Sequence, residues 1–192
     1  MRQLDDVGTT LLKAASDLLA DEGASALTVR RIAAEAGMST MNVYSRFGSK
    51  DGVVEHLFIE GFRLLAEEMH HAGTTDDPLA DLRRCGQAYR RFALTNATLY
   101  SVMFDRVVPD FMPSAEALAV AGDTLAALAS RLERAMQADL VSRRDPLHAA
   151  AIVWATCHGV MSLELKHAGP ETIEWERVFD DACAAIVRGL AE

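Results

Sequence analysis

Cysteine is scarce in this chain of 192 residues, and its three cysteines, Cys85, Cys157 and Cys183, are widely spaced in the sequence. An odd number at these spacings indicates neither a disulfide framework nor a zinc module. Long apolar runs are also missing, because charge or glycine interrupts each of them well short of the roughly 20 residues that span a bilayer. We therefore expect no membrane span and no bound metal.

The amino terminus, Met1 to Asp6, lacks the apolar run of a secretory signal. Half of the residues are hydrophobic and 24% are charged, which excludes intrinsic disorder, because disorder requires low hydrophobicity together with high charge. The composition therefore predicts a folded, soluble protein of the cytoplasm.

No segment shows the alternating pattern of a strand, whereas helical periodicity extends along the whole chain. The Asp77-Pro78 and Asp145-Pro146 pairs are typical of helix starts, and Ser114 and Thr172 are candidate caps for two further helices. We predict an all-α fold of about nine helices, near 5–22, 28–36, 40–47, 51–71, 78–94, 97–106, 114–141, 146–167 and 173–190. The break at 72–77 separates an amino-terminal domain (5–65) from a carboxy-terminal one (75–192).

Charge is distributed unevenly. The whole chain carries a formal charge of -9, which argues against a nucleic-acid partner because phosphate favours a basic surface. Residues 28–50 nevertheless carry +3, and the remainder carries -12. A small basic segment on an acidic body is compatible with a DNA-binding patch, although a merely solvated surface would look the same.

The same segment has the pattern of a helix-turn-helix, here over 28–47. Thr28 can cap a short helix, and Gly37 can end that helix in a left-handed conformation. Ser39 can cap a second helix anchored by Val43 and Phe47. Such a motif places its second helix in the DNA major groove, whereas the alternative is an ordinary three-helix packing unit with a polar face.

Side chains expected on the outer face of the second helix suit DNA. Arg46 can reach guanine or phosphate, Asn42 can pair with adenine, and Thr40 can contact thymine. Tyr44 and Ser45 are phosphate donors. Lys50 is expected at the start of the next helix, where the positive end of the helix dipole makes a cation unfavourable by about 0.3–1 kcal/mol. A phosphate bound at this helix end would offset that cost.

Residues 27–39 and 43–52 resemble the amino-terminal domain of the TetR family of bacterial transcriptional regulators, and the similarity extends over about the first 65 residues. Val53 and Val54 stand where that family more often has leucine. The resemblance implies DNA contacts by Thr28, Arg30, Thr40, Met41, Asn42, Tyr44 and Lys50. With Ser39, Ser45 and Arg46 these residues form our predicted DNA-binding set.

The carboxy-terminal part resembles, in residues 154–165 and 96–104, the TetR carboxy-terminal class named for its Trp, His and Gly. That resemblance implies a helical effector domain with a small-molecule pocket and a two-fold dimer. An apolar seam over 146–167 and a stripe over 173–190 predict that these helices from two subunits form a four-helix bundle. The alternative is that both complete the core of one subunit. The seam consists of Leu147, Ala151, Trp154, His158, Met161 and Leu165, and the stripe of Trp175, Phe179, Ala182, Ile186 and Leu190.

The predicted effector site is adaptable and mostly apolar, because methionine and large aromatic residues suit such a cavity. Each of these residues, taken singly, is also an ordinary core residue. The candidates for this site are Phe62, Phe92, Tyr100, Met103, Phe104, Trp154, His158 and Met161.

A metal protein or helical enzyme is the rival interpretation. Its materials would be His158, Cys157, Glu164, His167 and the pair at 70–71, but none has the spacing of a metal-binding helix. Phosphate loops and nucleophile elbows are also missing. A ligand-binding module with a vestigial DNA domain is a third possibility.

The sequence thus predicts a homodimeric regulator that binds a palindromic double-stranded operator, has no cofactor and is not an enzyme. A small molecule would release it from DNA, with the helix over 51–71 as the lever.

Overall fold

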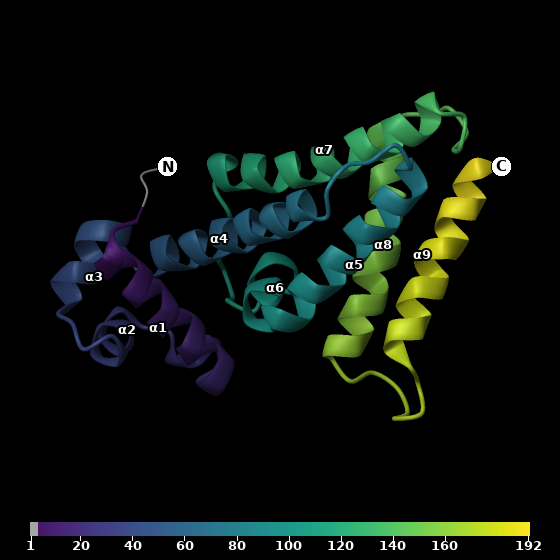
Figure 1. The fold of residues 1–192 in the computed structure, drawn as a ribbon. Coiled ribbons are helices and arrows are strands. Elements are labelled where there is room, and N and C mark those ends of the chain that lie inside the picture. Colours follow the sequence, from purple (N-terminus) through teal and green to yellow (C-terminus); the bar gives the residue numbers. More distant parts are fainter. Residues whose placement is uncertain (1–3) are drawn as a thin grey trace. The chain divides into compact units, whose positions relative to one another are not determined.

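The computed structural model describes residues 4–192, and within them it contains nine α-helices, one 3-10 turn (Ala24–Ala26) and no strand (Figure 1). This confirms the predicted all-α fold. Residues 1–3, part of the acidic amino terminus, lie outside the described residues. The helices are α1 (Asp6–Glu22), α2 (Val29–Glu35), α3 (Thr40–Phe47), α4 (Lys50–His71), α5 (Pro78–Thr95), α6 (Ala97–Phe104), α7 (Ala115–Gln137), α8 (Pro146–Leu165) and α9 (Trp175–Ala191).

The helices belong to two compact units. The first unit consists of residues 4–62 and Thr98–Val120, and the second of Arg63–Ala97 and Ala121–Glu192. Three helices contribute residues to both units: α4, α7 and, through Ala97 alone, α6. None of the helices within residues 4–192 combines the length and the apolar character that crossing a membrane requires.

In the first unit, α1, α2 and α3 pack on one another around a continuous apolar core. Leu11, Ile32, Val43 and Val53 are completely inaccessible to solvent. These residues come from four different helices, and their burial supplies most of the stability of such short elements.

Most of the predicted helix starts are confirmed. The Thr28 side chain accepts a hydrogen bond from the Arg31 amide at 3.2 Å, and Asp77 accepts from the Leu79 and Ala80 amides at 3.1 and 3.0 Å. Asp145 and Ser114 cap α8 and α7 in the same way. Each cap satisfies amides that the helix itself leaves without a partner.

Two predicted boundaries are wrong. Thr172 does not cap the last helix, because a turn closed by the Ile173 amide and the Pro170 carbonyl occupies this stretch and α9 begins only at Trp175. The seventh helix ends at Gln137 rather than near 141, because Asp139 adopts a left-handed φ of 55°. The amides of Asp139 and Leu140 then bond to carbonyls of the last turn and end the helix.

In the second unit, α8 and α9 run side by side (Figure 1) and both pack against α5. Only one side of α8 is buried, with Val153, Cys157 and Met161 facing the core. Phe179 and Leu190 anchor α9. Leu147, Trp154 and Leu163, on the remaining surface of α8, stay exposed by 50%, 37% and 48%.

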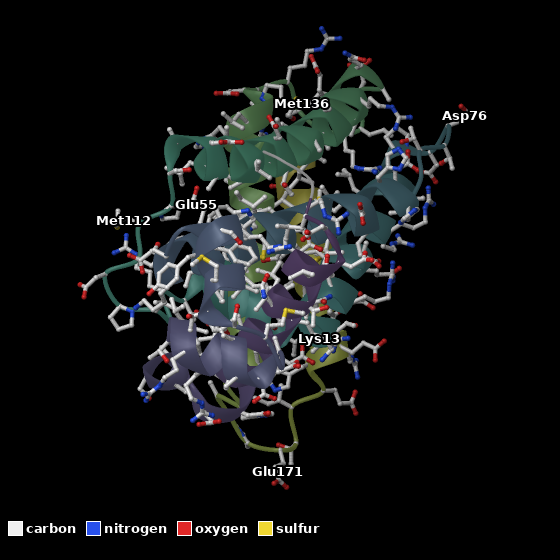
Figure 2. All side chains as sticks on the ribbon, turned by 90° about the vertical axis from the view of Figure 1, so that its left-hand side faces the viewer. Lys13, Glu55, Asp76, Met112, Met136 and Glu171 are labelled. Carbon is white, nitrogen blue, oxygen red and sulfur yellow. The ribbon has the colours of Figure 1, made fainter. Side chains whose placement is uncertain are left out.

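A buried carboxylate organises the loop between α4 and α5, in which Asp76 is labelled in Figure 2. Asp81 is fully buried and accepts hydrogen bonds from the amide and hydroxyl of Thr75. Arg84 forms an ion pair with it, and Arg134 of α7 reaches its Oδ2 at 2.8 Å. Arg134 also donates to the Thr75 carbonyl at 2.6 Å, so the network joins α5, α7 and the loop.

These partners set the ionisation of Asp81. Burial alone would raise the pKa of this carboxyl, but the hydrogen bonds from Thr75 and Arg134 and the charge of Arg84 outweigh burial and hold the pKa well below its ordinary value of 3.8. A carboxyl whose pKa is depressed on folding stabilises the folded state fully above its unfolded pKa. That contribution is lost as the pH falls from 3.8 toward the folded pKa.

We therefore expect Asp81→Asn to lower the melting temperature at neutral pH by about 5–10 °C, because it removes a buried anion that two arginines contact. The difference from the wild type should shrink as the pH is lowered below 3.8. Thermal unfolding followed by circular dichroism between pH 3 and pH 8 measures it, with exposed Asp76→Asn as the matched control. An equal decrease in melting temperature at every pH would contradict the electrostatic role of Asp81.

Candidate nucleic-acid interface

The helix-turn-helix is formed by α2 and α3. Gly37 has a φ of 64°, and its amide and that of Met38 bond to the carbonyls of Ala34 and Ala33 at 3.0 and 2.8 Å. The predicted left-handed stop at Gly37 is confirmed. This turn fixes the direction in which the chain enters α3.

Two residues hold α3 against the rest of the unit. Val43 is fully buried and Phe47 is 7% exposed. The ring of Phe47 also meets the edge of His56 at a centroid distance of 4.9 Å. Gly52 permits the following helix to begin close by, since a Cβ there would lie 1.8 Å from the Phe47 carbonyl oxygen. The buried pair therefore fixes which side of α3 faces outward.

The outer side of α3 carries the residues that the sequence predicted for it. Met41 and Tyr44 are 70% and 53% exposed, and Asn42 and Arg46 are half-buried. Ser39 stands at the start of the helix, but its side chain caps no amide. The other members of the predicted set in this region, Thr28, Arg30, Ser39, Thr40 and Ser45, are exposed.

Arg46 is the centre of a hydrogen-bonded cluster. Its Nε and Nη2 donate to the two carboxylate oxygens of Asp5 at 2.8 and 2.6 Å. Its Nη1 donates to Asn42 Oδ1 at 3.2 Å and to Ser45 Oγ at 3.3 Å. Asn42 Nδ2 lies 3.4 Å from Ser39 Oγ. Arg46 thus links Asp5, which precedes α1, to the outer face of α3.

Asp5 has two functions in this cluster. It caps α1 through the Gly8 amide at 2.8 Å and pairs in bidentate fashion with Arg46. The hydrogen bond from Arg46, followed by that from the Gly8 amide, holds the pKa of Asp5 well below its ordinary value, and the same pairing raises the pKa of Arg46. The guanidinium is therefore held in a fixed orientation beside Asn42.

Lys50 is the first residue of α4, and its side chain is 40% exposed. The Nζ atom lies 3.8 Å from Asp51 Oδ1. The Ser49 hydroxyl accepts a hydrogen bond from the Gly52 amide at 3.1 Å and caps α4. The first turn of α4 therefore presents a cation beside amide groups that point out of the helix end.

The residues predicted to line an effector pocket divide between the two units. The first unit holds Phe62, Tyr100, Met103 and Phe104. Phe62 and Tyr100 each contact the Phe104 ring, at centroid distances of 5.5 and 4.8 Å. Met103 lies against Gly61. These four residues form a packed cluster in the first unit.

The other four, Phe92, Trp154, His158 and Met161, belong to the second unit. Phe92 and Met161 are buried. The Trp154 and His158 rings lie one helical turn apart on α8, with centroids 6.0 Å apart. In the same unit Arg90 pairs with Glu164 at 2.6 Å, while Arg90 Nε and Glu164 Oε2 are buried without a hydrogen-bond partner among the described residues.

The structure does not group the residues that the rival interpretation, a metal protein, would use as ligands. Within residues 4–192, no three histidine, cysteine, aspartate or glutamate side chains are grouped so that they could hold a metal ion. His70 and His71 are neighbours at the end of α4, with ring centroids 6.2 Å apart.

Sequence reasoning missed Asp5, because nothing local connects a residue at position 5 with one at position 46. An aspartate before a helix indicates a cap, and that prediction would have been correct but incomplete. The bidentate pair depends on how α1 crosses α3, which only the tertiary structure provides.

Comparison with known proteins agrees with this geometry. The family model described as bacterial regulatory proteins of the tetR family matches residues 11–57, and one described as a tetracyclin repressor-like carboxy-terminal domain matches residues 82–186. The HTH-type transcriptional regulator Rv1816 of Mycobacterium tuberculosis is 30% identical over 98 residues. That alignment covers 48% of this chain and 41% of the relative, which is less than half of either.

Solved structures match over almost the full length. A protein of unknown function from Rhodococcus sp. RHA1 superimposes with a TM-score of 0.84 at 22% identity, covering 99% of this chain and 98% of that one. The TetR family transcriptional regulator PfmR from Thermus thermophilus gives a TM-score of 0.72 at 22% identity, covering 94% and 98%. At these identities the likeness shows the fold, whereas the carboxy-terminal family model alone covers more than half of the sequence. On that ground the chain belongs to the TetR family of bacterial regulatory proteins.

Proposed function

We propose that this chain is a sequence-specific transcriptional regulator that binds a palindromic operator as a homodimer and is released from it by a small molecule, most simply as a repressor. The observation that carries the proposal is the outer face of α3, where exposed Met41 and Tyr44 flank a fixed Asn42–Arg46 pair. It would act in the cytoplasm, on the nucleoid. We divide it into a DNA-binding domain over 5–65 and an effector and dimerisation domain over 75–192.

In this proposal the outward residues have different roles. Tyr44, Ser45 and Lys50 bind phosphate, as does Arg30 at the start of α2, and these contacts set the register on the duplex. Thr40, Met41 and Asn42 face the base edges, since an asparagine side chain can bond adenine through two atoms. Thr28 and Ser39, at the starts of α2 and α3, complete the set.

Arg46 stays within the interface as a residue that positions Asn42. Because Asp5 occupies two of its donors, a third is directed at Asn42 Oδ1. That contact holds the amide in one of its two orientations, with the nitrogen toward Ser39. We expect this preorganisation to sharpen base discrimination more than it raises affinity.

The dimer would form through α8 and α9. The predicted seam of α8 is partly exposed within one subunit: Leu147 and Trp154 are exposed, and only Met161 of its six members is fully buried. Gly159 and Gly189 have open space around them, so a second copy could approach these helices closely. An exposed apolar surface on two adjacent helices favours a second copy of the chain as its occupant.

Effector binding belongs to the carboxy-terminal domain. Trp154, His158 and Gly159 on α8 support its assignment to the class named for Trp, His and Gly, which stays a prediction. Phe92, Met161 and the Trp154–His158 pair supply apolar and polar groups, and the Arg90–Glu164 pair adds a buried donor and acceptor. The predicted ligand set also keeps four residues of the first unit, Phe62, Tyr100, Met103 and Phe104, and α4 stays the predicted lever of release. No catalytic role is proposed.

The first test is selection of bound duplexes from a random DNA library. We expect enrichment of an inverted repeat, because a two-fold dimer reads two half-sites.

Lys50→Ala should weaken binding to all sequences and reduce the slope of log affinity against log salt by about 2, because one phosphate contact is lost in each subunit. Fluorescence anisotropy on the selected duplex measures the slope, with exposed Lys166→Ala as the control. An unchanged slope would refute the phosphate contact, and failure to enrich any motif at low salt would refute the proposed function.

The role of Asp5 predicts a separate effect. Asp5→Asn keeps a good capping residue but removes the charge that holds Arg46. We expect partial loss of discrimination, by about 2- to 5-fold, at the base position that Asn42→Ala relaxes by about 5- to 100-fold, since a good bidentate contact is worth about 1–3 kcal/mol. Affinity for nonspecific DNA should not fall. Competition binding with single-base operator variants measures this, and Asp17→Asn, which removes the exposed Lys13–Asp17 pair, is the matched control. An equal loss of affinity for every single-base operator variant would argue for a purely structural role of Asp5.

The dimer surface is tested by Leu147→Glu, which places a charge on an exposed member of the α8 seam and should shift the protein to a monomer. Binding to the full inverted repeat should then fall by at least about 100-fold, while binding to a half-site changes little. Sedimentation velocity gives the oligomeric state. Leu118→Glu alters a leucine that is 55% exposed on α7 and should leave the dimer intact. Retention of the dimer by Leu147→Glu at micromolar concentration would exclude this surface.

A further inference from the structure

Two of the three cysteines meet in the second unit, although 26 positions separate them in the sequence. Cys157 on α8 and Cys183 on α9 lie with their sulfur atoms 3.5 Å apart, close enough for one thiol to donate to the other. Cys157 is buried and Cys183 is partly exposed. All three cysteines of the chain are free thiols.

Position 86, which faces the Cys183 sulfur, has no side chain. Gly86 of α5 faces Cys183, and a Cβ added at Gly86 would lie 3.7 Å from the Cys183 sulfur. A disulfide needs a sulfur separation of about 2.05 Å. The two helices already pack together, so rotation of the two cysteine side chains could bring the sulfurs to that distance. Gly86 has no side chain in their way.

We propose that Cys157 and Cys183 form a reversible disulfide between α8 and α9 when the protein meets a hydroperoxide, with Cys183 as the attacking thiol and Cys157 as the resolving one. Cys183 is the more accessible of the two, and peroxide reaches accessible sulfur first. The hydrogen bond from Cys157 lowers the pKa of Cys183, although burial and nearby Asp180 act the other way. The same contact, together with burial, raises the pKa of Cys157.

The chemistry balances with hydrogen peroxide as the oxidant. The Cys183 thiolate attacks one peroxide oxygen, the O–O bond breaks, and the departing hydroxide takes up a proton to become water. This leaves a sulfenic acid on Cys183. The Cys157 sulfur then attacks the Cys183 sulfur, and its proton leaves with the displaced hydroxide as a second water. Two electrons pass from the thiols to the peroxide, and a thiol reductant restores both cysteines.

The experiment treats the full-length protein with one to ten equivalents of hydrogen peroxide and maps its tryptic peptides without reduction. We expect peptide 145–166 joined to peptide 178–188, with reversal by dithiothreitol. The melting temperature of the oxidised protein should rise by about 5–10 °C, because the bond closes a loop of about 27 residues. Cys85→Ser should behave like the wild type, since Cys85 is buried and its burial raises the pKa of that thiol.

Single substitutions distinguish the two roles. Cys157→Ser should stop at a sulfenic acid on Cys183, trapped by dimedone, whereas Cys183→Ser should remain unoxidised at the same dose. The proposal is overturned if the wild type yields no 157–183 link, if linkage occurs only between subunits, or if Cys183 is overoxidised equally fast with and without Cys157. None of these measurements uses DNA, so their outcome is independent of the proposed function.

Discussion

The helix-turn-helix depends on the burial of two side chains. A helix of eight residues is not stable alone in water, and α3 is held by Val43 and Phe47, which are 0% and 7% exposed. These two residues are one turn apart, so they also fix the rotation of α3 about its axis. The exposure of Met41 and Tyr44 and the half-burial of Asn42 and Arg46 follow from that rotation. The surface that we propose for DNA recognition is thus a consequence of core packing.

Local patterns predicted most of the fold. The periodicity of apolar residues, the Asp-Pro pairs and Gly37 determine where helices begin and end, and each acts through neighbours in sequence. The two wrong boundaries involve weaker local signals. Thr172 is an acceptable cap that a competing turn displaces, and Asp139 ends α7 in a left-handed conformation for which glycine or asparagine would have been the usual marker.

The candidate site could be predicted only as far as local sequence determines it. The outward set on α3 follows from helical spacing, but the bond between Asp5 and Arg46 joins residues 41 positions apart. The Cys157–Cys183 contact likewise joins two helices whose relative rotation no periodicity specifies. The spacing of the cysteines alone predicted no zinc module and no disulfide framework, and it did not reveal the pair that tertiary packing brings to 3.5 Å.

The charge distribution limits how this surface can bind DNA. Of the four cations in residues 28–50, Arg46 is paired with Asp5 and Arg31 with Glu22. The rest of the chain is strongly acidic, so one subunit offers little net attraction to phosphate. In the proposed function, affinity then comes from two copies that engage paired half-sites together, because linking the sites multiplies their individual contributions. A change that misaligned the two copies would abolish that binding without altering any DNA contact, so the proposal makes the apolar surface of α8 and α9 as important for recognition as α3 itself.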